Sequence, residues 1–279
     1  MKRSRAIRAQ LTRIADALER LAPLPLAEVD PREGAAFLWS EGRLAAVRLS
    51  AQPLDLLLGI DAQKVAVLGN VERLAAGVPA HDMLLWGARG MGKSALVKAS
   101  VADVAARGGA IALVEIARDE LATLPQLFAR LEATAPKAFL VFADDLSFEA
   151  DERQWKALRS VLEGGLNARS DHVRLAATSN RRHLVAREMA ENDPIHPRDV
   201  ADDRLALADR FGLSLGFHPC DQDTYLAIVG GYAHARGLPF DPLDALAWAM
   251  ARGSRSGRVA WQYVQEVTAI ANMPSAPAR

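Results

Sequence analysis

Cysteine is nearly absent from this sequence, which has Cys220 as its single thiol in 279 residues. One thiol excludes an intramolecular disulfide framework and a cysteine-based metal site. Apolar runs are also short, and none approaches the about 18 residues needed to cross a bilayer. The basic N-terminus is not followed by the continuous apolar segment of a signal peptide. We therefore expect a cytoplasmic protein with no membrane association.

The sequence has no excess of either charge, since 34 Lys and Arg balance 34 Asp and Glu for a formal net charge of +0. This balance argues against a strongly basic nucleic-acid-binding protein, although it leaves room for a local basic patch. Hydrophobic residues make up 50% of the chain and charged residues 24%, which is the composition of a globular protein. The length fits one large domain or two small ones.

The first 50 residues are expected to form a helical extension. Apolar residues recur at spacings of three and four over 1–22, which predicts an amphipathic helix with a net charge of +4. Such a helix could pack on the body of the protein or serve as an arm that binds a partner or a nucleic acid. Apolar clusters in 36–58 follow no period that assigns them to a helix or a strand.

An alternation of strands and helices begins after residue 60. Short apolar runs predict five strands at 83–86, 111–116, 138–143, 173–178 and 213–217, with helices between them at 93–106, 124–133, 152–165 and 181–190. This pattern predicts an α/β fold with a five-stranded parallel sheet and helices on both faces. Only helices follow, at about 221–236, 241–252 and 257–271. We expect four regions: the extension (1–50), an α/β unit (51–218), a small all-helical lid (219–272) and a frayed tail (273–279).

A glycine-rich segment connects the first of these strands to the next helix and matches the phosphate-binding pattern GxxxxGK[ST]. Its glycines let backbone N–H groups surround a polyphosphate, and the helix that follows adds its positive end. Lys93 would reach the β- and γ-phosphates of ATP, and Ser94 would supply a hydroxyl to Mg²⁺. The residues expected to bind the nucleotide here are Gly87, Ala88, Arg89, Gly90, Met91, Gly92, Lys93, Ser94 and Ala95.

Two acids end the apolar strand at 138–143, as in a Walker B motif. Asp144 would help to hold Mg²⁺ beside Ser94. Asp145 would orient the attacking water, although many ATPases of this type have the longer Glu at this position. Glu149 is a weaker candidate for that base. The alternative is that both acids only cap a helix.

Three further side chains are expected at the site. Asn180 ends a strand, where it could bond the γ-phosphate and the attacking water or merely cap the next helix. Arg210 precedes the last strand, where it could reach the γ-phosphate of a neighbouring subunit or form a surface pair with Asp209. Arg258 opens the final helix and could fold over the nucleotide, with Arg255 as a competing choice.

This order of motifs resembles that of AAA+ ATPases, over roughly residues 36–272. More narrowly, the chain is similar to a bacterial family of P-loop ATPases of unassigned function, through the stretches Asp144–Phe148, Ser179–His183 and Asp209–Leu213. The resemblance implies ATP between the sheet and the lid, with Asn180 as sensor 1, Arg210 as the arginine finger and Arg258 as sensor 2. It also implies that Ile60 contacts the adenine.

Several functions remain compatible with these motifs. The first is an oligomeric ATPase that uses Arg210 in trans and remodels or loads a macromolecule, for which we favour a protein partner. The second is a slow or non-hydrolysing switch or scaffold, suggested by Asp145. A DNA-associated loader has support only from the 1–22 segment and the basic tip Arg181–His183. A small-molecule kinase is disfavoured because nothing in the expected lid suggests an acceptor pocket.

Overall fold

The computed structural model describes residues 10, 12–13, 29–146, 152–163, 170–180 and 210–272. Within these ranges, no helix has both the length and the hydropathy required to cross a bilayer. Several expected features lie outside the described residues: most of the helix over 1–22, Glu149, the helix at 181–190, the basic tip Arg181–His183, Asp209 and the tail 273–279.

All five predicted strands are present and pair in parallel, but the expected total of five is wrong. The described sheet has seven strands in the order β2-β1-β4-β5-β6-β3-β7. β1 pairs in parallel with β4, and β2 pairs antiparallel with β1 at the edge of the sheet. The strands are β1 (Ala36–Ser40), β2 (Arg43–Ala46), β3 (Met83–Gly87), β4 (Ile111–Ile116), β5 (Ala138–Ala143), β6 (Val173–Ser179) and β7 (Leu213–Phe217).

The two additional strands form a hairpin inside the stretch that we expected to be a helical extension. Its two-residue turn consists of Glu41 and Gly42, whose φ values are +51° and +73°. Positive φ at both turn residues suits the right-handed twist of a tight hairpin. Phe37 and Trp39 are buried at alternate positions of β1, and Leu44 is buried from β2. Because these strands have only five and four residues, the alternation of buried and exposed positions cannot be distinguished in the sequence from the apolar residues around it.

Helices cover both faces of the sheet, as predicted. Alternate strand residues belong to different hydrophobic clusters: Leu84, Val141 and Leu175 pack with α4 and α5, whereas Leu85 and Leu140 pack with α2 and α3. Because successive side chains of a strand point to opposite faces and both faces are covered, β5 is apolar throughout and its neighbours β4 and β6 are apolar over most of their length. The helical segments of this part of the chain are η1 (Leu54–Leu56), α2 (Asp61–Ala75), α3 (Lys93–Ala106), η2 (Arg118–Thr123), α4 (Leu124–Glu132) and α5 (Glu152–Glu163).

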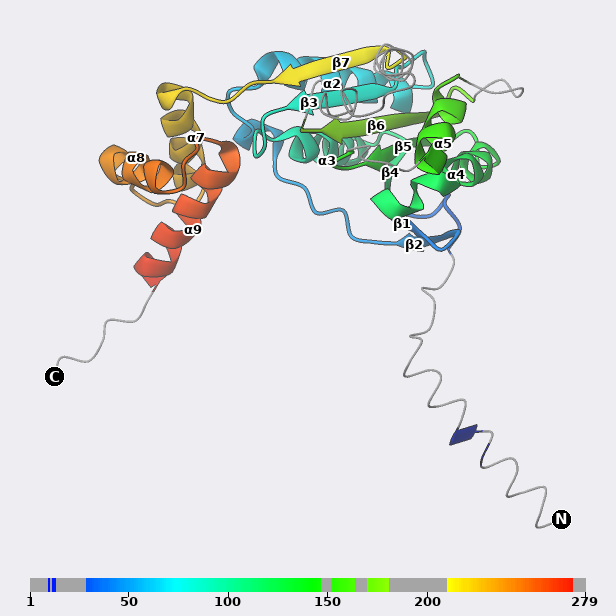
Figure 1. Ribbon diagram of the computed structural model, residues 1–279, viewed down its shortest axis with the longest axis horizontal. Helices are drawn as coiled ribbons and strands as arrows, with labels where there is room; N and C mark the ends of the chain where they lie inside the picture. The colour runs from blue at the N-terminus through cyan, green and yellow to red at the C-terminus, as the bar shows by residue number, and fades with distance from the viewer. Residues whose placement is uncertain are drawn as a thin grey trace, which may run out of the picture.

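Three further helices follow β7 and form what we call the C-terminal helical unit: α7 (Gln222–His234), α8 (Pro242–Ala251) and α9 (Gly257–Asn272). They share a hydrophobic cluster of their own. The Asp221 and Asp241 carboxylates cap α7 and α8 by accepting backbone N–H groups at 2.8 and 2.7 Å. Figure 1 shows the unit beyond the tips of the β3 and β7 arrows, at the carboxyl end of the sheet.

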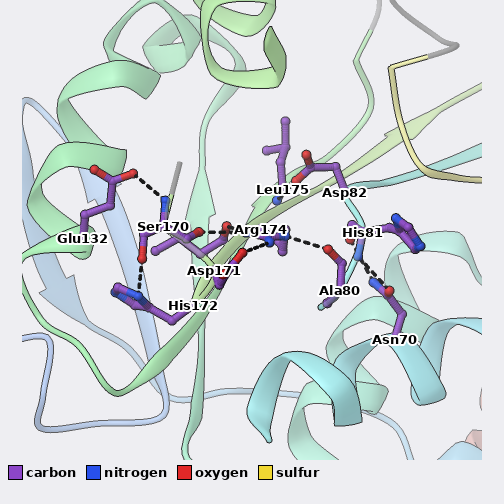
Figure 2. Close-up of polar contacts among 11 residues, drawn as sticks. Asn70, Ala80, His81, Asp82, Glu132, Ser170, Asp171, His172, Arg174 and Leu175 are labelled. Carbon is purple, nitrogen blue, oxygen red and sulfur yellow. Dashed lines mark hydrogen bonds and ion pairs between the residues drawn. The ribbon is translucent and has the colours of Figure 1, made fainter. Parts of the chain in front are cut away.

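The opposite end of the sheet is occupied by a polar network (Figure 2). The Arg174 guanidinium donates to the carbonyls of Ala80 at 2.7 Å and Ser170 at 2.7 Å. The Asp82 carboxylate accepts the Leu175 N–H at 2.7 Å. These bonds join β6 to the segment that leads into β3, and they satisfy backbone groups that the strands leave unpaired. We read this network as structural, since its polar groups bond one another.

Candidate nucleotide-binding site

A pocket of about 520 Å³ lies between the carboxyl end of the sheet and the C-terminal helical unit. One end is polar and the other is apolar, which suits a ligand with a charged tail and a flat hydrophobic head. The polar end is lined by Arg89, Gly90, Met91, Gly92, Lys93, Ser94, Ala95, Asp144, Asp145, Thr178, Asn180, Gly257 and Arg258. The apolar end is lined by Gln52, Leu56, Leu57, Leu58, Ile60, Ile228, Tyr232 and Trp261.

The glycine-rich loop runs from the end of β3 to the start of α3, as predicted. Gly92 is the residue before α3 and has φ of +87°, a conformation that side chains with a Cβ rarely adopt. Gly90, with φ of +74°, passes close to the helical unit: a Cβ there would lie 2.8 Å from Ser256 Oγ and 3.0 Å from Arg258 Cβ. The Gly90 carbonyl accepts the backbone N–H of Arg258 at 3.1 Å. Glycine therefore permits both the curvature of the loop and its contact with α9.

Lys93 is the cation at the centre of the polar end, and it is only 7% exposed. Its Nζ donates to the Gly87 and Ala88 carbonyls at 2.8 Å each and to Asn180 Oδ1 at 3.3 Å. Burial lowers the pKa of Lys93, while the carboxylates of Asp145 and Asp144 oppose that shift. Gly87 and Ala88 are not among the described residues that line the pocket, and they contribute to the site through these carbonyls.

The Walker residues Ser94 and Asp144 meet at the carboxyl end of β5. Ser94 Oγ donates to Asp144 Oδ1 at 2.6 Å. A third member of this group, Thr178, was not predicted from the sequence; it is 1% exposed near the end of β6. Its hydroxyl donates to Asp144 Oδ1 and accepts the Asp145 N–H at 2.8 Å. A polar residue directly after the apolar run 175–177, at the carboxyl end of the strand, is the sequence signal that could have identified it.

The donor set fits Mg²⁺ together with a polyphosphate. Magnesium prefers hard oxygen ligands and is held by one or two protein groups plus phosphate oxygens. Ser94 and Asp144 supply a hydroxyl and a carboxylate at one point of the polar end. Within the described ranges, no group of three or more His, Cys, Asp or Glu could hold a metal by protein ligands alone. Ser94 and Asp144 would therefore need a phosphate to complete such a site.

Asp145 faces Asn180 across the same end of the pocket. Asn180 Nδ2 donates to Asp145 Oδ1, while Asn180 Oδ1 accepts from Lys93. Asp145 has φ of +53°, an uncommon backbone conformation that Asp tolerates better than most residues. Its N–H bonds to Thr178 Oγ1 and to Asp144 Oδ1, and these bonds hold the backbone in this conformation. The turn brings its short carboxylate to the amide of Asn180.

Two of the remaining predicted residues line the pocket and one does not. Ile60 is 4% exposed at the apolar end, and the exposed side chain of Arg258 lines the polar end. Arg210 is not among the described residues that line the pocket. Its guanidinium bonds to Glu163 Oε1 at 2.9 Å, on α5. The pKa of Glu163 is lowered first by its hydrogen bond to Arg159 and then by the charges of Arg159 and Arg210.

The apolar end contains residues that the sequence analysis did not single out. Leu56, Leu57 and Leu58 come from η1 and the segment after it, whereas Tyr232 and Trp261 come from the C-terminal helical unit. The two aromatic rings pack edge to face with centroids 5.3 Å apart. No motif marks these side chains in the sequence, because they meet only when the helical unit packs beside η1.

The fold is that of P-loop AAA+ proteins, as two solved structures show. RuvB of Thermotoga maritima, titled a Holliday junction branch migration motor, matches with a TM-score of 0.55 and 17% identity over 79% of this chain. The ORC1 protein of Aeropyrum pernix, solved in complex with DNA, matches with a TM-score of 0.55 and 16% identity over 81%. The matches span only 65% and 64% of those two chains, and at this identity they show the fold alone.

The particular family follows from the sequence match. Residues 32–271 match the family described as "Protein of unknown function (DUF815)", and the chain belongs to it. None of the curated proteins matches the chain. The family and the fold confirm the resemblance inferred from the motifs. Neither of them assigns a role to an individual residue of the pocket.

Thr178→Val should lower the free energy of unfolding by about 1–3 kcal/mol, because the buried Thr178 hydroxyl makes two hydrogen bonds, to the Asp145 N–H and the Asp144 carboxylate, that the variant loses. Urea denaturation without nucleotide measures this loss. Thr268→Val is the matched control: its half-buried hydroxyl donates to the Val264 carbonyl within α9 and accepts a long bond from Arg236 at 3.3 Å, and we expect a change below about 0.5 kcal/mol. Equal effects of the two variants would contradict the role assigned to Thr178.

Proposed function

We propose that this chain binds Mg-ATP and hydrolyses it as an assembly of several copies, and that its nucleotide state drives the remodelling or loading of a macromolecular partner. One observation carries the proposal: Lys93, the Ser94–Asp144 pair and the Asp145–Asn180 pair converge on the polar end of a single pocket. A buried cation beside a hydroxyl–carboxylate pair and a carboxylate–amide pair suits phosphoryl transfer to water.

The phosphate-binding part of the proposal rests on the loop and the start of α3. The backbone N–H groups of residues 89–94 and the positive end of α3 would hold the phosphates. Lys93 would exchange its bonds to the Gly87 and Ala88 carbonyls for phosphate oxygens, which are stronger acceptors. Ser94 and Asp144 would hold Mg²⁺. When bound, the ion supplies positive charge that stabilises the transferring phosphoryl group.

The hydrolytic part of the proposal rests on Asp145 and Asn180. Asn180 contacts both Lys93 and Asp145, so it can bridge the phosphate-binding cation and the carboxylate. Asp145 would orient a water molecule and accept its proton, and Asn180 would hold that water against the γ-phosphate. Both side chains come from the carboxyl ends of neighbouring parallel strands, where ligands of such sheets bind.

Coupling to a partner would run through the C-terminal helical unit, which we propose acts as a lid (219–272) over the α/β unit (51–218). The unit contacts the phosphate-binding loop through the Arg258 N–H and the Gly90 carbonyl. The Arg258 side chain, which lines the polar end, would sense the γ-phosphate and move the lid. We propose that Arg210 acts in trans, since it bonds Glu163 away from the pocket of its own chain.

The proposal is tested by Mg²⁺-dependent ATP hydrolysis across a protein dilution series. An arginine supplied by a neighbouring subunit makes the rate per subunit rise with protein concentration. We expect specific activity to increase over the range in which sedimentation shows assembly with ATP. A constant specific activity from a protein that stays monomeric with ATP would contradict the assembly.

A second candidate function, an ATP-dependent switch with negligible turnover, is favoured by one specific observation. The carboxylate of Asp145 is one methylene shorter than that of Glu and already bonds to Asn180. Turnover near one per second, in the range of ordinary enzymes, would exclude the switch. Binding of ATP without turnover at any concentration would favour it.

We favour a protein partner over a nucleic acid, because the net charge of +0 offers no strong attraction to phosphate backbones. A DNA-associated loader remains the alternative. It predicts DNA binding that weakens steeply with added salt.

A further inference from the structure

Besides the Tyr232 hydroxyl and the Trp261 indole N–H, the apolar end of the pocket is lined by one amide side chain, which can offer a base a donor and an acceptor at once. This is Gln52, which is half-buried and lines the pocket among the leucines of 56–58. Its Oε1 accepts a hydrogen bond from Tyr232 Oη at 3.2 Å, although the two residues are 180 positions apart in the chain. The bond joins the segment before η1 to α7, directly beside the region where a base would lie.

The contact with Tyr232 determines how the Gln52 amide is presented. Tyr232 is 6% exposed, and burial raises its pKa, so the hydroxyl keeps its proton and acts as the donor. A carbonyl oxygen has two lone pairs, of which Tyr232 uses one. Among the described residues, no group accepts a bond from Gln52 Nε2. The amide therefore offers one acceptor site and two donor hydrogens.

We propose that Gln52, held in orientation by Tyr232, selects adenine over 6-oxopurines at this site. The inference rests on the proposed function and deepens it, because it names the residue that sets the nucleobase preference. Adenine presents an exocyclic N–H donor beside a ring-nitrogen acceptor, and an amide pairs with both groups at once. The free lone pair of Gln52 Oε1 would accept the exocyclic N–H, and Nε2 would donate to the ring nitrogen.

A 6-oxopurine would be rejected by the same amide. Guanine and hypoxanthine have an oxygen acceptor where adenine has its amino group. That oxygen would face Gln52 Oε1, and two acceptors cannot share a hydrogen bond. If the amide turns over, Nε2 can donate to that oxygen and to Tyr232 Oη, but Gln52 Oε1 then faces the N7 acceptor of the 6-oxopurine, so one unfavourable contact remains. The apolar walls formed by Ile60, Ile228 and the leucines offer no polar group to compensate.

The test compares the Kd values of Mg-ATP and Mg-ITP by titration calorimetry. ITP has a carbonyl oxygen in place of the 6-amino group and is otherwise close to ATP. Gln52→Met keeps the length of the side chain and removes the amide, and Gln52→Ala is the second variant in case methionine fills the pocket. Tyr232→Phe removes only the hydroxyl that orients the amide. Matched controls are Gln63→Ala, whose amide bonds the Gly216 carbonyl, and Tyr263→Phe, whose hydroxyl bonds the Asp241 carbonyl.

We expect the wild type to prefer ATP, and we expect either Gln52 substitution to reduce the ATP/ITP affinity ratio by about tenfold. Tyr232→Phe should reduce the ratio by a smaller factor, and the two controls should leave it unchanged. If the Gln52 variants bind ATP with an unchanged ratio, this inference is wrong and the proposed function stands. If the wild type binds neither triphosphate, the proposed function itself fails, and the inference fails with it.

Discussion

A Lys93→Ala chain should fold normally and lose Mg-ATP hydrolysis by about a thousandfold, which is the scale for removing one preorganised cation or donor from a transition state. Lys93 is the buried cation of the polar end, and desolvation strengthens its attraction to phosphate oxygens. Its charge also stabilises bound nucleotide, so the affinity for ATP should fall by about a hundredfold. Steady-state phosphate release and titration calorimetry measure the two effects.

The matched control is Lys98→Ala. Lys98 lies on the same helix and is ion-paired with Glu115 at 2.8 Å, and it is not among the described residues that line the pocket. We expect its loss to leave hydrolysis and ATP affinity within about twofold of the wild type, because partly exposed ion pairs contribute little. Comparable losses in the two variants would show that Lys93 acts only through the fold. Circular dichroism of both variants checks that they are folded.

Arg210→Ala should reduce hydrolysis by about a thousandfold while leaving ATP affinity nearly unchanged, as expected for a residue that stabilises the transition state from a neighbouring subunit. Such a variant keeps its own phosphate-binding residues and lacks only the arginine that it would offer to its neighbour. A mixture of Arg210→Ala and Lys93→Ala chains should therefore recover activity that neither variant has alone. Phosphate release at several mixing ratios measures this complementation.

Arg159→Ala is the control for Arg210. Arg159 bonds the same carboxylate, Glu163 Oε1, at 2.6 Å. If Arg210 served only to pair with Glu163, the two alanine variants would have similar, small effects. No recovery of activity in mixtures that still assemble would contradict action in trans. Sedimentation of the mixtures with ATP establishes that assembly.

The five parallel strands from β3 to β7 and the helices α3, α4 and α5 were predictable because their signals are local. The central strands are apolar on both faces, and the run 138–143 coincides with β5. The loop 87–94 was predictable for the same reason, since its glycines, lysine and serine are contiguous and the chemistry depends on backbone geometry between a strand and a helix. The polar residues 144, 145 and 180 follow from the rule that parallel strands end at one edge.

The β1–β2 hairpin was not predictable in the same way. Its strands are five and four residues long, too short for the alternation of buried residues to be distinguished from scattered apolar clusters. Its place beside β4 depends on pairing with a strand more than 60 residues later in the chain. Local propensity does not report such a pairing.

The sequence by itself determined the order along the chain of the central strands and helices and most residues of the polar end, because each depends on neighbouring positions in the chain. Only the tertiary structure decided the apolar end, where Gln52 meets Tyr232 from 180 positions away. It also decided the buried position of Thr178, between the Asp144 carboxylate and the Asp145 N–H, and the pairing of Arg210 with Glu163. The physical reason is that these contacts arise from packing between elements, which no local pattern of residues encodes.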